Sequence, residues 1–153
     1  MGGGQTAWAT AMPEHVRDKS SRTALERNGR RVRVLTVDDQ AVFRRVAKDV
    51  IVATLGFEAI GEAESGEDAV TAAERLRPDL VLLDVRMPGI GGIEAARRIT
   101  TAHPDTVVVL ISIEDPDEVS HTVRGSGAAA LVRKQDFGPA LLRRIWAEHL
   151  RTR

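Results

Sequence analysis

The chain of 153 residues lacks several features that mark particular classes of protein. It has no cysteine, which excludes disulfides, thiolate catalysis and cysteine-bound zinc. Lys plus Arg number 22 and Asp plus Glu number 22, so the chain lacks the basic excess that would indicate DNA binding. No apolar run approaches the roughly 20 residues of a membrane span, and residues 2–11 are too mixed for a signal peptide. We therefore expect a cytoplasmic protein that contacts neither membrane nor nucleic acid directly.

Aromatic residues are scarce too, at 3% of the chain with no tyrosine, so we expect an aliphatic core. The length suits one domain with a core, plus a tail. Residues 1–30 contain three consecutive glycines, scattered charge and no sustained periodicity, which predicts a flexible N-terminal tail. Residues 31–153 are then the single domain.

Five strand-like segments alternate with helical patterns in this domain. The continuous apolar run at residues 80–83 is typical of a strand buried on both faces of a parallel sheet. The other four segments are residues 32–37, 57–63, 106–111 and 128–133. Because βαβ connections are right-handed, the pattern predicts an α/β fold, a doubly wound five-stranded parallel sheet with helices on both faces.

Helix boundaries are marked by capping residues. Ser65 and the pair Asp115-Pro116 predict helix starts, and Gly56 predicts the end of the first helix. We expect that first helix to bury an apolar stripe made of Val42, Phe43, Val46, Ala47, Val50, Ile51 and Leu55.

Reactive side chains stand at the carboxyl ends of four of the five segments. Asp84 ends the buried run, Asp38 and Asp39 follow the first segment, and Ser112 and Lys134 follow the last two. In open α/β sheets the ligand crevice lies outside the carboxyl ends of the strands. Each residue alone is more often a cap or a solvated side chain, but five on one rim indicate a functional site.

The chemistry of this set favours phosphoryl transfer. Three neighbouring carboxylates repel one another unless a proton or a cation joins them. Oxygen ligands without nearby histidine or cysteine favour Mg²⁺. Lys134 suits a phosphoryl oxygen and Ser112 is a compact donor, while Asp84 is the candidate nucleophile, with Asp38 and Asp39 as metal ligands.

Four stretches together resemble response-regulator receiver domains of two-component signalling, across about residues 31–151. They are Val37-Asp38-Asp39, the segment 82–89 around Asp84, Ile111-Ser112, and residues 127–134 ending in Lys134. The resemblance implies a flavodoxin-like (βα)5 fold. It also implies phosphorylation of Asp84 by a histidine kinase or a histidine phosphotransfer protein.

The same resemblance implies the ligands and roles of the site residues. Mg²⁺ would be held by Asp39, Asp84 and the backbone carbonyl of Arg86, with Asp38 helping mostly through water. Ser112 and Lys134 would contact the phosphoryl group. The protein would be a stand-alone, chemotaxis-regulator-like receiver that acts on a downstream protein target, as a monomer or a phosphorylation-dependent dimer. It would be no enzyme beyond its own phosphorylation and autodephosphorylation.

Three positions depart from the family pattern. The family usually has an aromatic switch residue three positions before the lysine, where this chain has Leu131, and a proline after the lysine, where it has Gln135. The position after the hydroxyl is usually small, but here Ile113 is expected to crowd the site. We expect the phosphoacceptor set to function and the aromatic-switch output to be weakened.

Three alternatives remain from the sequence. The chain could be the receiver portion of a longer DNA-binding response regulator, with the arginines of its last residues starting a linker. A phosphatase with an Asp nucleophile would want Asp-x-Asp and a cap domain, whereas Asp38 and Asp39 are adjacent and the chain has no room for a cap. A nucleotide-binding domain is disfavoured because the first strand ends in acids rather than glycines.

Overall fold

The computed structural model describes residues 30–152, in which five strands alternate with five α-helices. In chain order they are β1 (Val32–Val37), α2 (Ala41–Ala53), β2 (Phe57–Ala63), α3 (Gly66–Leu76), β3 (Leu80–Asp84), α4 (Gly91–Ala102), β4 (Val107–Ser112), α5 (Pro116–Val123), β5 (Ala130–Arg133), the short 3-10 helix η2 (Lys134–Asp136) and α6 (Pro139–Thr152). The predicted tail, residues 1–30, lies almost wholly outside the described part. Within that part, no helix is long and apolar enough to cross a membrane.

The strands form one parallel sheet in the order β2-β1-β3-β4-β5. The central strand β3 is buried at all five positions, as its continuous apolar run predicts. The order reverses direction next to β1, which places β1 and β3 at the switch point where such sheets bind ligands. The predicted doubly wound α/β fold is confirmed.

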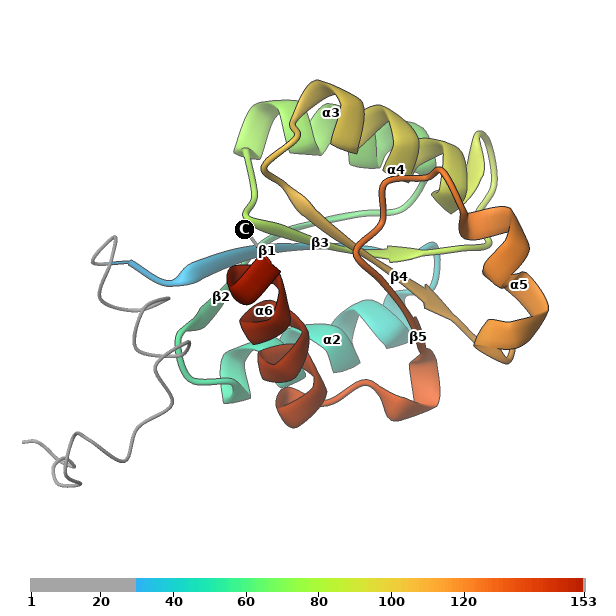
Figure 1. The fold of residues 1–153 in the computed structure, drawn as a ribbon. Helices are drawn as coiled ribbons and strands as arrows, with labels where there is room; N and C mark the ends of the chain where they lie inside the picture. The colour runs from blue at the N-terminus through green and yellow to red at the C-terminus, as the bar shows by residue number, and fades with distance from the viewer. Residues whose placement is uncertain (1–29, 153) are drawn as a thin grey trace, which may run out of the picture.

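Helices cover both faces of the sheet (Figure 1), with α3 and α4 on one face and α2 and α6 on the other. Alternate residues of each strand supply the two cores. In β3, for example, Val81 and Leu83 face α3 and α4, whereas Leu80 and Leu82 face α2 and α6. The five carboxyl ends therefore meet at one rim, between the two helical layers.

The two cores differ in composition. The layer of α3 and α4 is aliphatic and rich in alanine, and it contains no aromatic ring among the described residues. The layer of α2 and α6 holds every aromatic residue of residues 30–152, namely Phe43, Phe57, Phe137 and Trp146. The expectation of an aliphatic core thus holds for one layer only.

Both predicted helix caps are confirmed. The side chain of Ser65 accepts a hydrogen bond from the amide of Asp68 at the start of α3. Asp115 accepts one from the amide of Asp117, and Pro116 occupies the first turn of α5.

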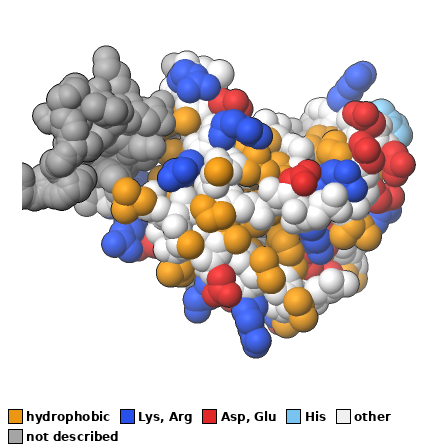
Figure 2. Space-filling view, turned by 90° about the horizontal axis from the view of Figure 1, so that it is seen from below, with side chains coloured by type: hydrophobic (Ala, Val, Ile, Leu, Met, Phe, Trp, Pro, Cys, Tyr) orange, Lys and Arg blue, Asp and Glu red, His pale blue; other side chains and the backbone are white. Residues whose placement is uncertain are grey.

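The first helix differs from its prediction in its end and its buried face. It ends at Ala53, three residues before the expected stop, because the backbone of Thr54 is extended (φ −98°, ψ 115°) and cannot continue the helix. Gly56 instead supplies a left-handed turn at φ 91°. Val42 and Leu55 are each 77% exposed, so the apolar stripe is wider than the buried face. Seen from below (Figure 2), the surface of the molecule on the side of α2 and α6 shows hydrophobic side chains among basic and acidic ones.

Candidate functional site

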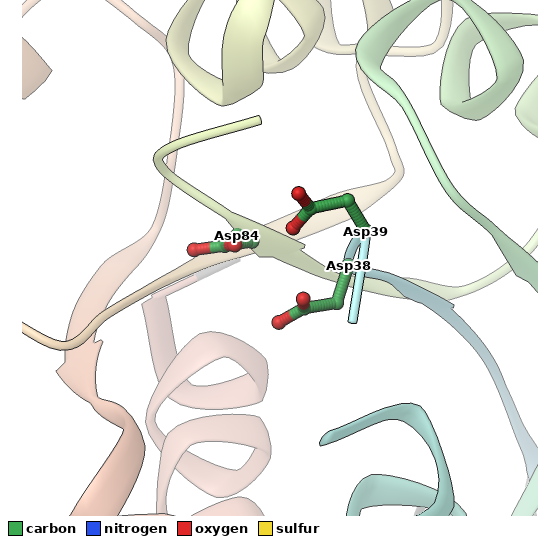
Figure 3. A group of neighbouring side chains, drawn as sticks. All are labelled: Asp38, Asp39 and Asp84. Carbon is green, nitrogen blue, oxygen red and sulfur yellow. The ribbon is translucent and has the colours of Figure 1, made fainter. Parts of the chain in front are cut away.

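Three carboxylates meet at the rim between β1 and β3. Asp84 is the last residue of β3, and Asp38 and Asp39 directly follow β1, whose last residue Val37 pairs in register with Leu83. One carboxylate oxygen from each lies within 4.8 Å of the others. The side chains leave two adjacent strand ends toward the same space (Figure 3). The predicted metal ligands Asp38, Asp39 and Asp84 are thus brought together.

Lys134 reaches this cluster from the end of β5. Its Nζ lies 2.7 Å from Oδ2 of Asp38 and 3.7 Å from Oδ2 of Asp84. The other oxygen of Asp38 accepts the amide of Gln40 at 2.8 Å, so this fully buried carboxylate is held on both sides. The ammonium therefore lies beside the proposed nucleophile.

Asp84 carries a strongly perturbed carboxyl group. Its pKa is raised from 3.8 to about 6, first by burial and next by the negative charge of Asp38. Lys134 and the Arg86 amide, which donates to Oδ1 of Asp84 at 3.4 Å, oppose that rise. A cation at the rim would relieve both causes of the rise, because it would neutralise the crowded negative charge.

Ser112 lies on the strand next to Asp84, and Arg86 follows Asp84 by two residues. Ser112 ends β4, one residue beyond Ile111, which pairs in register with Asp84. Its hydroxyl accepts the amide of Glu114 at 2.9 Å, which leaves the hydroxyl proton free to donate. The amide of Arg86 turns back to Asp84, which puts its main chain at the site.

The side chain of Arg86 makes a contact that the sequence did not indicate. Its guanidinium donates to both carboxylate oxygens of Glu114, at 2.8 and 3.0 Å. This exposed ion pair joins the loop after β3 to the loop after β4, on either side of the rim. Behind Asp84, Gly92 of α4 approaches so closely that a Cβ there would collide with the Asp84 carbonyl oxygen.

The three departures from the family pattern take distinct places. Leu131 is half-buried and packs against the layer of α3 and α4. The bond between Lys134 and Gln135 is trans, since the described residues contain no cis peptide. Ile113 is 70% exposed, so its side chain extends into solvent, contrary to the expected crowding at Asp84.

Phe43 is a site residue that sequence reasoning assigned only to the core. Its ring centroid lies 4.8 Å from Nζ of Lys134. A signal was present: Phe43 is an aromatic residue four positions after Asp39 in a chain with 3% aromatics. Helical spacing alone could not show that its ring faces a lysine more than 90 residues later.

A sheet of this order, with an acidic and lysine-bearing rim at its switch point, defines a flavodoxin-like α/β protein. The model of the response regulator receiver domain matches residues 34–145. The chain belongs to that family, as its sequence motifs indicate.

Curated relatives are similar over part of their length. The response regulator GacA of Pseudomonas viridiflava is 39% identical over 103 residues, which are 67% of this chain and 48% of that protein. The transcriptional regulatory protein DegU of Brevibacillus brevis is 31% identical over 71% of this chain and 47% of its own length. The chain thus spans about half the length of these relatives.

Solved structures of the family share the fold. The response regulator domain of Thermotoga maritima CheB is 33% identical, with a TM-score of 0.63 over 80% of this chain and 92% of that one. A chain of the CheX–CheY–BeF3–Mg²⁺ complex of Borrelia burgdorferi gives a TM-score of 0.74 at 23% identity, over 86% of this chain and 98% of that one.

Proposed function

We propose that the chain is a phosphorylation-controlled signalling protein of a two-component phosphorelay, with Asp84 as its phosphoryl acceptor. The observation that carries this proposal is the position of Asp84. It ends a fully buried strand, stands within 4.8 Å of two further carboxylates, and has the Lys134 ammonium 3.7 Å away. A carboxylate used as a nucleophile needs such positioning and charge stabilisation.

The proposed phosphoryl transfer forms one bond to phosphorus and breaks another. An oxygen of Asp84 attacks the phosphorus of a donor phosphohistidine, a P–O bond forms, and the P–N bond breaks as the imidazole leaves and takes up a proton. In this proposal the Lys134 ammonium, 3.7 Å from Asp84, and the Ser112 hydroxyl, at the end of the neighbouring strand β4, bind the transferred oxygens. Water later attacks the phosphorus of the acyl phosphate, the bond from phosphorus to the Asp84 oxygen breaks, and inorganic phosphate leaves the regenerated carboxylate. The chain turns over no other substrate in this proposal.

The donor set fits Mg²⁺, because carboxylate oxygens stand together and no histidine or cysteine joins the cluster within residues 30–152. Asp39, Asp84 and the Arg86 carbonyl would hold the ion, with Asp38 acting through water. When bound, the ion supplies positive charge that offsets the repulsion around Asp84 and the charge of the phosphoryl group. The family and the Mg²⁺ named in the Borrelia burgdorferi complex support this assignment.

We further propose that a histidine kinase or histidine phosphotransfer protein is the donor, that a downstream protein is the target, and that both meet this chain in the cytoplasm. The family supports this, since response regulators function in two-component systems.

The test is phosphate uptake from a small phosphodonor, such as acetyl phosphate, in the presence of Mg²⁺. Intact-mass measurement should show one added phosphoryl group that hydroxylamine removes. Asp84→Asn should abolish it. Asp79→Asn is the matched control, since Asp79 precedes the same strand at its opposite end and binds Arg30 instead. Equal uptake by Asp84→Asn, or continuous turnover of a phosphomonoester, would contradict the proposal.

A second candidate is the receiver portion of a longer DNA-binding regulator. It is favoured by one observation: the aligned residues make up only 48% of GacA and 47% of DegU. Sequencing the native gene on both sides of this chain tests it. A DNA-binding segment in the same reading frame would establish this candidate, and stop codons at both ends would exclude it.

A further inference from the structure

We propose that Phe43 is a positioning residue of the phosphoacceptor site, which holds the Lys134 ammonium beside Asp84 with the face of its ring. The inference rests on the proposed function, because it assigns to Phe43 a part in phosphoryl transfer. Three groups surround the ammonium: Asp38 at 2.7 Å, Asp84 at 3.7 Å and the Phe43 ring centroid at 4.8 Å. The lysine side chain is only 15% exposed.

The contact has the geometry of a cation–π interaction, in which the negative face of the ring attracts an ammonium within about 6 Å of its centroid. A ring differs from a carboxylate as a partner of the ammonium, because it attracts the ammonium without neutralising its positive charge. Asp38 already neutralises Lys134 in part. A further acid at the position of Phe43 would hold the ammonium away from a phosphoryl oxygen, whereas a ring keeps it near with its charge available.

Phe43 is itself held from two directions. It lies in the first turn of α2 and packs against the core beneath the sheet. Its ring also contacts that of Phe137, with centroids 6.2 Å apart and planes tilted by 51°. The amide of Phe137 donates to the carbonyl of Lys134 at 3.2 Å. The main chain of Lys134 is thus fixed to Phe137 and its side chain to Phe43.

A purely structural role is the alternative, in which Phe43 fills the space between α2 and η2 and the lysine merely lies near. Leucine at position 43 separates the two roles, because it keeps most of the apolar volume and removes the π face. Tyrosine keeps the face, at a position that is half-buried and not fully enclosed. Phe137→Leu is the matched control, since it removes the neighbouring ring and leaves the ring that faces Lys134.

The first measurement needs no phosphorylation. The full chain has three lysines, Lys19, Lys48 and Lys134, so lysine-selective labelling gives a simple NMR spectrum. The ε protons of Lys134 should be shifted upfield by the ring current of Phe43 in wild type, Phe43→Tyr and Phe137→Leu. They should move to the positions of the other lysines in Phe43→Leu. An unchanged upfield shift in a folded Phe43→Leu would overturn the inference.

The second measurement is the rate of phosphate uptake from acetyl phosphate at saturating Mg²⁺. Phe43→Leu should slow it by about three- to tenfold, the range expected from the strength of a partly desolvated cation–π contact. Phe43→Tyr and Phe137→Leu should stay within about twofold of wild type, as should the Mg²⁺ affinity of all variants. A wild-type rate in Phe43→Leu would overturn the inference, as would an equal loss in Phe137→Leu. If wild type itself took up no phosphate, the proposed function would fail, and the NMR comparison would still decide whether Phe43 holds the ammonium.

Discussion

The rim joins two halves that are packed to very different degrees. The acceptor half comprises the end of β1, β3 and α4: β3 is buried at all five positions, and α4 buries Gly92, Ala95, Ala96 and Ile99. The transmission half comprises α5 and β5, which follow the fully buried strand β4: α5 buries Val119 alone, and β5 buries only Val132.

Under the proposed function, this difference in packing suits the two halves to different tasks. A segment with few buried apolar contacts opens or rearranges at low cost, whereas a densely packed one keeps its geometry. The acceptor half can therefore hold a carboxylate cluster in place against its own repulsion. Under the proposed function, the transmission half is the part that a charge change at Asp84 would move, although it lacks the aromatic residue through which the family usually transmits that change.

The largest effect is expected where the acceptor half is tightest. Gly92→Ala should lower the free energy of unfolding by about 3 kcal/mol or more, because its Cβ would collide with the Asp84 carbonyl oxygen and the main chain must move. Gly138→Ala is the matched control, with open space around the added methyl group, and should cost less than about 1 kcal/mol. Urea denaturation measures the free energy of unfolding of both variants. Equal losses in the two would show that the acceptor half is less rigid than its packing indicates.

Removing the charge of Asp84 should give the next largest effect. Its folded-state pKa of about 6 lies above the ordinary 3.8, so the folded protein binds the proton more tightly and loses stability as the pH rises through this window. Asp84→Asn lacks that loss. In metal-free buffer, the free energy of unfolding of Asp84→Asn should therefore rise relative to that of wild type between pH 4 and pH 7. The expected rise is about 1 to 2 kcal/mol, after allowance for solvent screening. If the free energies of unfolding of wild type and Asp84→Asn changed in parallel with pH, the raised pKa of Asp84 would be contradicted.

Mg²⁺ should stabilise the acceptor half by a similar or smaller amount. At ten times its dissociation constant, a ligand that binds only the folded state adds about 1.4 kcal/mol. Thermal unfolding should therefore shift upward with Mg²⁺ in wild type and not in Asp39→Ala, which loses one carboxylate of the cluster. Asp49→Ala, an exposed acid on α2, should keep the shift. An equal shift in Asp39→Ala would remove Asp39 from the metal site.

The smallest effect is expected in the transmission half. Leu131 cannot make the inward–outward swing or the hydrogen bond of an aromatic switch residue. Phosphorylation should therefore change the affinity for a downstream partner less than tenfold, or about 1.4 kcal/mol. Titration of the partner against both forms measures the ratio, and Leu131→Tyr should increase it. A hundredfold ratio in the unaltered chain would show that Leu131 does not weaken the switch.

The sequence predicted the features that depend on local patterns. The buried run before Asp84 located the central strand, and the caps at Ser65 and Asp115 located two helix starts. Because parallel strands share one carboxyl rim, the positions of the acids and Lys134 followed from strand order.

What the sequence could not predict depends on contacts between distant segments. The apolar stripe of α2 did not show which side chains remain exposed, because a helix pattern contains no information on how far the neighbouring layer extends. The contacts of Phe43 with Lys134 and of Arg86 with Glu114 join residues on different loops and helices. Side-chain directions at the rim decide those contacts, and residue spacing does not determine them.

The unequal distribution of rings between the two cores also decides what optical methods can observe. Within residues 30–152 every aromatic side chain belongs to the layer of α2 and α6, where Trp146 stacks edge-on against Phe57 at 6.5 Å. Near-ultraviolet circular dichroism from this part of the chain therefore reports on that layer alone. An unfolding event confined to α3, α4 or α5 would leave the signal unchanged, and amide hydrogen exchange would be needed to detect it.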